Sequence, residues 1–209
     1  MTKKLVSPGG ERRIPNYYDG YIQLINSFVF LRFEQVLPYL KMEDTVVDFG
    51  CGVGWGTKFM SCFCRRIFGI DNSEEALNMA SSRNNAENIL WQRSAMTNTK
   101  LFKKSSIDLV TSIASIEHIS REDMICFLKM CFDILKPKGY MVGTTTKFRA
   151  SSIVNASPWH LFEPGMASFT KIVSPYFDII TLENFKLFPN NPKNKQMEGR
   201  FVLRSKKIK

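Results

Sequence analysis

Thr45-Val-Val-Asp-Phe-Gly-Cys-Gly-Val-Gly-Trp-Gly-Thr57 decides the fold, together with Arg66-Ile-Phe-Gly-Ile-Asp71 further along the chain. An apolar strand runs into a turn dense in glycine, a helix follows, and the next strand ends on an acid. Such a unit cradles an adenosine-bearing cofactor, because glycine lets the backbone approach the ligand and the acid accepts hydrogen bonds from both ribose hydroxyls. We therefore expect an α/β fold with a cofactor site at this turn.

The spacing of the glycines distinguishes between cofactors. A dinucleotide fingerprint needs Gly-x-Gly-x-x-Gly, and counting from Gly50 and Gly52 places Trp55 at the third glycine. An indole at this position argues against NAD or FAD, because helix, strand and pyrophosphate must meet there. The spacing Asp48-x-Gly50-x-Gly52-x-Gly54 instead resembles the first motif of class I S-adenosylmethionine (SAM) methyltransferases.

This resemblance implies a set of cofactor-binding residues. In that family, Asp71 would be the acid that binds the ribose. The third strand of the family usually ends in Asp-Ala, whose acid contacts the adenine amino group, and the matching pair here is Ser94-Ala95. The residues expected to bind SAM are Asp48, Gly50, Cys51, Gly52, Gly54, Asp71, Asn72, Ser94, Ala95, Met96 and Ser112.

Later motifs extend the resemblance over roughly residues 40–188. The segment 107–112 (Ile-Asp-Leu-Val-Thr-Ser) resembles the "FDLV" fourth strand of the family, and 135–142 resembles its "LKPGG" turn and fifth strand. A plainer interpretation is that the glycines only form a tight turn and that Asp71 caps a helix. The order and spacing of the later motifs favour the cofactor site.

Apolar runs alternate with helical patterns along the chain, which predicts βαβ units and a parallel sheet. Strands are expected at 45–49, 66–70, 89–93, 107–112, 140–146, 177–187 and 199–206, and helices at about 20–40, 55–64, 73–83, 121–135 and 165–173. The last two strands are joined by a short loop without a crossover helix, so they should be antiparallel.

These elements, with the resemblance, imply a single Rossmann-like class I methyltransferase domain over residues 1–209. Its seven-stranded sheet should be mostly parallel, with an antiparallel last strand and helices on both faces. Residues 1–44 would form a helical cap and 45–188 the core. Residues 189–209 would supply a loop, the last strand and a basic tail.

Methyl transfer to an alcohol requires a group that removes the hydroxyl proton. The chain has only two histidines, and a pKa of about 6.5 suits this role. His118 follows Glu117 beyond the fourth strand, and His160 follows the fifth, at the edge where α/β sheets bind ligands. We predict His160, His118 and Glu117 as catalytic residues. The alternatives are a loop-anchoring role for His118 and simple packing beside Trp159 for His160.

Short segments point to a kind of acceptor. Residues 10–15 (Gly-Glu-Arg-Arg-Ile-Pro) resemble the "GERxxP" opening of methyltransferases of surface-polysaccharide and glycan biosynthesis, and 157–163 resembles their "NPxHxxEF" segment. The resemblance implies a small-molecule substrate with a sugar or sugar-phosphate hydroxyl. Metal-dependent relatives carry E-x-x-E-H, whose first acid falls on Ala114 here, so no metal is expected. The alternative is that Glu117, His118 and His160 hold an ion weakly.

Composition bounds the remaining possibilities. The net charge is +10, and from Lys186 onward there are eight Lys or Arg residues and one acid. Such a tail can meet nucleic acid, but a solubilising end is the simpler interpretation. The rival functions are therefore an RNA 2′-O-methyltransferase and a SAM-binding protein without catalysis. Five cysteines without disulfide spacing, and no apolar leader or membrane-length run, predict a cytoplasmic protein.

Overall fold

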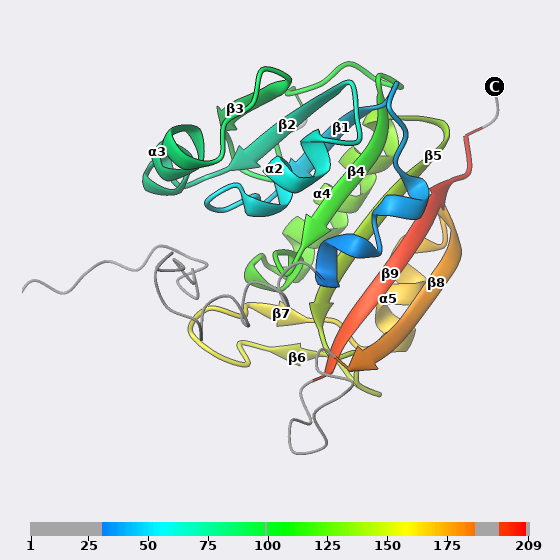
Figure 1. Cartoon of the computed structure of the whole chain (residues 1–209). Helices are drawn as coiled ribbons and strands as arrows, with labels where there is room; N and C mark the ends of the chain where they lie inside the picture. Colours follow the sequence, from blue (N-terminus) through cyan, green and yellow to red (C-terminus); the bar gives the residue numbers. More distant parts are fainter. Residues whose placement is uncertain (1–30, 99, 187–196, 208–209) are drawn as a thin grey trace, which may run out of the picture.

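A seven-stranded sheet in the order β3-β2-β1-β4-β5-β9-β8 forms the centre of the protein (Figure 1). The computed structural model describes residues 31–98, 100–186 and 197–207. The strands are β1 (Thr45–Phe49), β2 (Arg66–Asp71), β3 (Ile89–Arg93), β4 (Ile107–Ile113), β5 (Leu135–Thr146), β8 (Phe177–Lys186) and β9 (Met197–Ser205). The first five run parallel, and β9 lies antiparallel between β5 and β8. The predicted sheet is confirmed.

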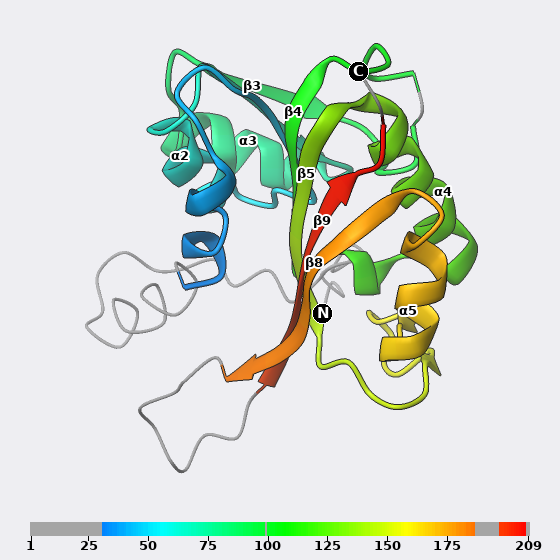
Figure 2. The same cartoon turned by 90° about the vertical axis from the view of Figure 1, so that its right-hand side faces the viewer.

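Helices cover both faces of this sheet (Figure 2). On one face lie α2 (Trp55–Ser61) and α3 (Glu74–Arg83), and on the other lie α4 (Arg121–Ile134) and α5 (Met166–Val173). Of the helix predicted at 20–40, residues 20–30 lie outside the described residues. Residues 31–34 are helical and lead into the 3-10 helix η1 (Leu37–Tyr39).

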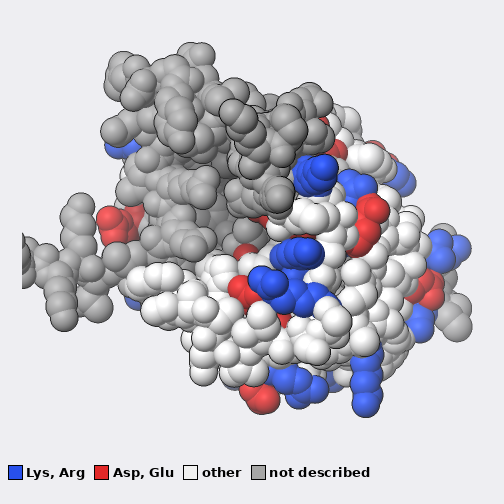
Figure 3. All heavy atoms as spheres, turned by 90° about the horizontal axis from the view of Figure 1, so that it is seen from below, with Lys and Arg blue, Asp and Glu red and all other residues white. Residues whose placement is uncertain are grey.

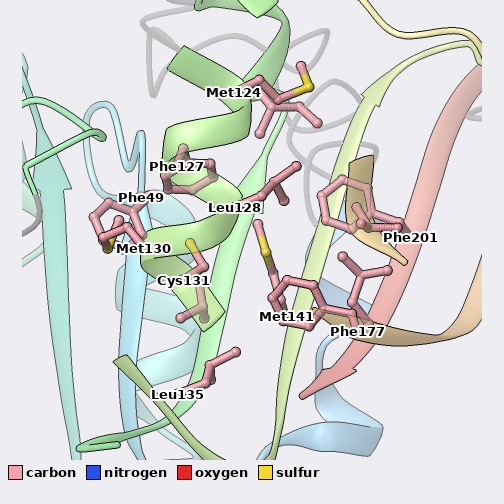
Figure 4. Close-up of a cluster of buried hydrophobic side chains, with 14 of the residues drawn as sticks. Phe49, Met124, Phe127, Leu128, Met130, Cys131, Leu135, Met141, Phe177 and Phe201 are labelled. Carbon is pink, nitrogen blue, oxygen red and sulfur yellow. The ribbon is translucent and has the colours of Figure 1, made fainter. Parts of the chain in front are cut away.

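Two hydrophobic clusters hold the helices to the sheet. Neighbouring residues of a strand point to opposite faces, so Val46 packs in the cluster that includes Met60 of α2, whereas Val47 packs in the cluster that includes Phe127 of α4. Figure 4 shows the second cluster, in which side chains of α4 meet Phe49 and Met141 of the sheet. Each fully buried side chain of this size contributes roughly 1.5–3 kcal/mol. This packing fixes the carboxyl ends of β1 and β4 beside each other.

The helix that follows β2 begins where its sequence predicts. Ser73 is the N-cap of α3, and its hydroxyl accepts a hydrogen bond from the backbone N–H of Ala76 at 3.3 Å. Glu74 and Glu75 occupy the first turn, where carboxylates interact favourably with the helix dipole. This start fixes the position of Asp71, two residues before the cap.

The chain between β5 and α5 forms a second, two-stranded sheet that the sequence did not predict. It pairs β6 (Ile153–Val154) with β7 (Phe162–Glu163) in antiparallel register. The strand β7 lies against the 3-10 helix η2 (Ile116–His118), which follows β4. This small sheet therefore returns the segment around His160 to the carboxyl edge of the main sheet.

Candidate active site

The glycine turn after β1 combines close packing with open space. Gly50, Gly52 and Gly54 have φ values of 71°, 56° and 86°, a region that glycine adopts readily. A Cβ atom on Gly50 would lie 2.5 Å from the Cβ of Ser115, and one on Gly54 would lie 2.5 Å from the Trp91 ring. Among the described residues, a Cβ on Gly52 would meet nothing within 4 Å. The turn is therefore packed from below at two glycines and open at the third.

The acid at the end of β2 lies beside this open position. The two carboxylate oxygens of Asp71 accept hydrogen bonds from the backbone N–H groups of Gly52 and Ser73, each at 2.9 Å. These bonds orient the carboxylate at the carboxyl end of the strand. The open backbone at Gly52 and this acid fit an adenosyl group with ribose hydroxyls.

Two of the residues predicted to bind the cofactor, Asp48 and Ser112, are buried beneath the glycine turn. Asp48 is buried, and its carboxylate accepts hydrogen bonds from Thr57 at 2.6 Å and Thr111 at 2.8 Å, which tie β1 to α2 and β4. Burial raises the pKa of Asp48 to about 6, although these hydrogen bonds lower it. Ser112 is also buried, and its hydroxyl is hydrogen-bonded to that of Ser115 at 2.7 Å. Both residues stabilise the turn from beneath.

The remaining predicted cofactor residues lie around the same edge. Burial raises the pKa of the Cys51 thiol well above its ordinary value, so this thiol is neutral. Ser94 follows β3, and its backbone N–H donates to the carbonyl oxygen of Asp71 at 3.0 Å. Ala95 and Asn72 are exposed, and Met96 is partly buried against the core. The carboxyl ends of β1, β2 and β3 thus bring these residues to one side of the glycine turn.

The three predicted catalytic residues form one cluster. Glu117 and His118 lie on η2, and His160 lies in the segment that precedes β7. One ligand atom of each of the three side chains lies within 4.8 Å of those of the other two. The centroids of the two imidazole rings are 5.2 Å apart, with the planes inclined by 61°.

Hydrogen bonds determine the tautomer of both histidines. The Nδ1 atom of His118 lies 2.7 Å from the backbone oxygen of Trp159, and Nδ1 of His160 lies 2.7 Å from Oε1 of Glu163. A carbonyl or a carboxylate oxygen only accepts, so each Nδ1 carries the hydrogen. In the neutral imidazole, the lone pair is then on Nε2. Glu163 was not among the predicted site residues, although it belongs to the segment 157–163 that carries the sequence resemblance.

The carboxylate of the cluster is removed from solvent. Glu117 is 4% exposed, and its Oε2 accepts a hydrogen bond from the hydroxyl of Thr145 at 3.0 Å. Burial raises the pKa of Glu117, while the neighbouring His118 and the Thr145 hydroxyl lower it. A buried carboxylate beside two imidazoles can stabilise a positive charge that develops on either ring.

Charges of both signs are mixed on the described part of the face at the carboxyl ends of the parallel strands (Figure 3). Several cations of the basic tail are engaged within the protein. Arg200 and Arg204 pair with acids on β8, while Lys206 and Lys207 donate to backbone carbonyl oxygens. These four cations thus hold the last strand to its neighbours, which argues against their use as a nucleic-acid surface. Within the described ranges, no helix is long and apolar enough to cross a membrane.

Residues 47–143 match the family model described as "Methyltransferase domain". Phosphoethanolamine N-methyltransferase of Plasmodium falciparum (isolate 3D7) is 29% identical over 149 residues, which cover 70% of this chain and 55% of that protein. Ubiquinone biosynthesis O-methyltransferase of Bradyrhizobium diazoefficiens is 28% identical, over 62% of this chain and 53% of that protein. The chain thus spans just over half the length of these two relatives.

A solved structure shows the same fold. N-methyltransferase NodS from Bradyrhizobium japonicum WM9, in complex with S-adenosyl-L-homocysteine, aligns with a TM-score of 0.67. The sequence identity is 16%, and the alignment covers 86% of this chain and 88% of that one. At this identity, the likeness concerns the arrangement of strands and helices.

Proposed function

We propose that this chain is a SAM-dependent methyltransferase that transfers the methyl group of SAM to a hydroxyl group of a small molecule. SAM is the cofactor. The observation that carries the proposal is the position of the Glu117, His118 and His160 cluster at the same edge of the sheet as the glycine turn. A base beside the cofactor site is needed for an alcohol acceptor, which resists deprotonation.

The glycine turn and β2 are proposed to hold the cofactor. Backbone at Gly52 would lie against it, and the carboxylate of Asp71 would accept hydrogen bonds from the ribose hydroxyls. Ser94 and Met96 would line the adenine side, with the serine hydroxyl in place of a carboxylate. When bound, SAM supplies an electrophilic methyl group on a sulfonium that leaves as a neutral thioether.

The histidine cluster is proposed to receive the acceptor hydroxyl. The Nε2 lone pair of a neutral imidazole accepts the hydroxyl proton, and the buried Glu117 stabilises the imidazolium that results. The hydrogen bond between His160 and Glu163 holds that ring in the tautomer that can act as a base.

We further propose that the acceptor is a sugar or sugar-phosphate hydroxyl. The segment 157–163, which resembles that of glycan methyltransferases, carries His160 into the cluster. Residues 10–15, the other part of this resemblance, lie outside the described residues. Lys147 and Arg149 are exposed near the same segment and are suited to binding a phosphate.

Incubating the protein with SAM and a panel of acceptors tests the proposal. The panel includes nucleotide sugars, sugar phosphates, catechols, ethanolamine phosphate and short RNA, with mass spectrometry of the products. We expect an O-methylated sugar product, together with S-adenosylhomocysteine. With that acceptor, His118→Ala and His160→Ala should each reduce turnover by roughly 10²–10⁴-fold while SAM still binds. Methylation of only an amine or RNA, or full activity in both variants, would contradict the proposal.

A further inference from the structure

We infer that Glu117, His118 and His160 form a binding site for one divalent transition-metal cation of the Zn²⁺ or Co²⁺ type. Their ligand atoms lie within 4.8 Å of one another, at the end of β4 and the start of β7. An ion of this type holds nitrogen and oxygen ligands at about 2.0–2.2 Å, so neighbouring ligands around it lie about 3–4 Å apart. Small rotations of the three side chains, moving each atom by less than about 1 Å, are enough to close the site.

The hydrogen bonds behind the imidazoles are those of metal-binding histidines. A ligating histidine nearly always donates its other ring N–H to a carboxylate or a backbone carbonyl, which fixes the ring and raises its basicity. Here His118 donates Nδ1–H to the backbone oxygen of Trp159, and His160 donates to Glu163. Both rings are thus fixed by a hydrogen bond at Nδ1, whereas a single general base requires only one oriented ring.

The balance of charge also favours a cation. Glu117 is buried, and Glu163 is buried behind His160. Among the described residues, Arg149 approaches Glu163 at 3.9 Å, and no Lys or Arg forms an ion pair with Glu117. A buried carboxylate is stable when it is paired or coordinates a metal. A divalent ion between Glu117 and two neutral imidazoles would provide this compensation.

The donor set determines the kind of ion. Imidazole suits Zn²⁺, Co²⁺, Ni²⁺ and Fe²⁺, whereas Mg²⁺ and Ca²⁺ prefer sites made of oxygen ligands. Three protein ligands leave at least one position open, as in catalytic metal sites. The sequence predicts no metal because Ala114 occupies the position of the first acid in E-x-x-E-H and offers no ligand atom. The tertiary structure supplies His160 as a third ligand from a different segment.

The role of the ion, unlike its binding, rests on the proposed function. An acceptor hydroxyl at the open position would have a lowered pKa and would release its proton to water. With the ion bound, this step replaces the imidazole as proton acceptor in the proposed function: both rings are ligands, and water receives the proton. Activity would depend on the ion, and the proton balance of the transfer would be unchanged.

Binding can be tested without an acceptor, on full-length protein from which any affinity tag has been removed. The chain has only two histidines, so imidazole coordination reports on His118 and His160 alone. Exposed thiols bind the same ions, and therefore Cys62→Ser and Cys126→Ser are combined as the background. Chelator-treated protein is titrated with Co²⁺, followed by visible absorption, and then with competing Zn²⁺, followed by metal analysis.

We expect one ion per chain and displacement of Co²⁺ by Zn²⁺ but not by Mg²⁺. Glu117→Gln, His118→Asn and His160→Asn should each weaken binding by roughly 10–100-fold or more. The control Glu183→Gln, on the edge strand β8, should bind as the background does. SAM titration of each variant verifies that it is folded.

Absence of Co²⁺ and Zn²⁺ binding at millimolar concentration, or binding that survives all three substitutions, would overturn the inference. Two activity outcomes separate it from the proposed function. Metal binding without methylation of any hydroxyl acceptor would support the metal site and contradict the proposed function. Methylation by chelator-treated, metal-free protein would support the proposed function and contradict an activating role of the ion.

Discussion

Gly50 and Ser115 lie against each other, so that a Cβ atom on Gly50 would lie 2.5 Å from the Cβ of Ser115. Gly50 begins the glycine turn, and Ser115 precedes η2, which carries Glu117 and His118. The Ser115 hydroxyl donates to the carbonyl oxygen of Phe49 at 3.2 Å and so joins the two loops. The proposed cofactor side and acceptor side are therefore one packed unit, because β1 and β4 are neighbours in the sheet.

This contact predicts that Gly50→Ala destabilises the fold. An alanine at this position would keep the positive φ of Gly50, which costs about 1–2 kcal/mol. Its Cβ would also clash with Ser115, which adds about 1–3 kcal/mol. We expect the free energy of unfolding in urea to fall by about 2–5 kcal/mol. A stability equal to that of the native protein would show that the two loops are not in contact.

Gly52→Ala should affect SAM binding more than the stability of the fold, the reverse of Gly50→Ala. The Cβ added by Gly52→Ala meets no atom of the residues that the structure describes within 4 Å, so we expect only the positive φ to destabilise the fold, by about 1–2 kcal/mol. The Cβ would project into the space proposed for SAM, and we expect the Kd for SAM to rise at least about 10-fold. Calorimetric titration with SAM measures this. An unchanged Kd would show that the cofactor does not lie against Gly52.

Asp71→Asn should weaken SAM binding by about 10–100-fold. The carboxylate accepts from Gly52 and Ser73, and it is proposed to accept from the ribose with charge-assisted bonds worth about 1.5–3 kcal/mol. Asp178→Asn, which affects an exposed ion pair with Arg204, is the matched control. Equal SAM affinities in the two variants would show that Asp71 does not bind SAM.

Glu163→Gln should lower kcat by about 10-fold or more without changing the Kd for SAM. The amide still accepts from Nδ1 of His160 but lacks the charge that raises the basicity of the ring. Steady-state kinetics with the identified acceptor measure kcat for Glu163→Gln and for the control Glu183→Gln. If Glu163 only packs the loop, the thermal stability would fall and kcat at low temperature would not.

The pKa of Asp48 predicts a pH dependence of stability. Burial raises this pKa to about 6 from an ordinary 3.8, so the native state binds the proton more tightly than the unfolded chain. The resulting stability is present below the ordinary pKa and is lost as the pH rises through about 6. With about 1.36 kcal/mol per pKa unit, the loss is about 3 kcal/mol.

Asp48→Asn lacks this titration. Urea unfolding of the two proteins between about pH 4 and pH 7 should show the native protein losing about 3 kcal/mol relative to the variant. Parallel pH curves for the two proteins would mean that Asp48 has an ordinary pKa.

Much of the fold follows from local patterns. Most strands and helices of the core begin and end within a few residues of their predicted positions, because apolar periodicity, the Ser73 cap and the glycine turn are encoded nearby. The exception is β5, which begins at Leu135 and so includes the turn that the sequence predicts before residue 140. The position of Asp48 was not predictable in the same way. Its sequence spacing predicts a place in the glycine motif, but its burial between Thr57 and Thr111 depends on how α2 and β4 pack on β1.

The sequence by itself determined the alternation of strands and helices, the glycine turn after β1 and the acid at the end of β2, since each depends on residues close together in the chain. Only the tertiary structure decided that His118 and His160 meet. Their segments lie about forty residues apart, and the unpredicted pairing of β6 with β7 brings His160 back to η2. A short sequence pattern carries no information about such a contact, because it arises from the packing of distant backbone segments and not from local conformational preference.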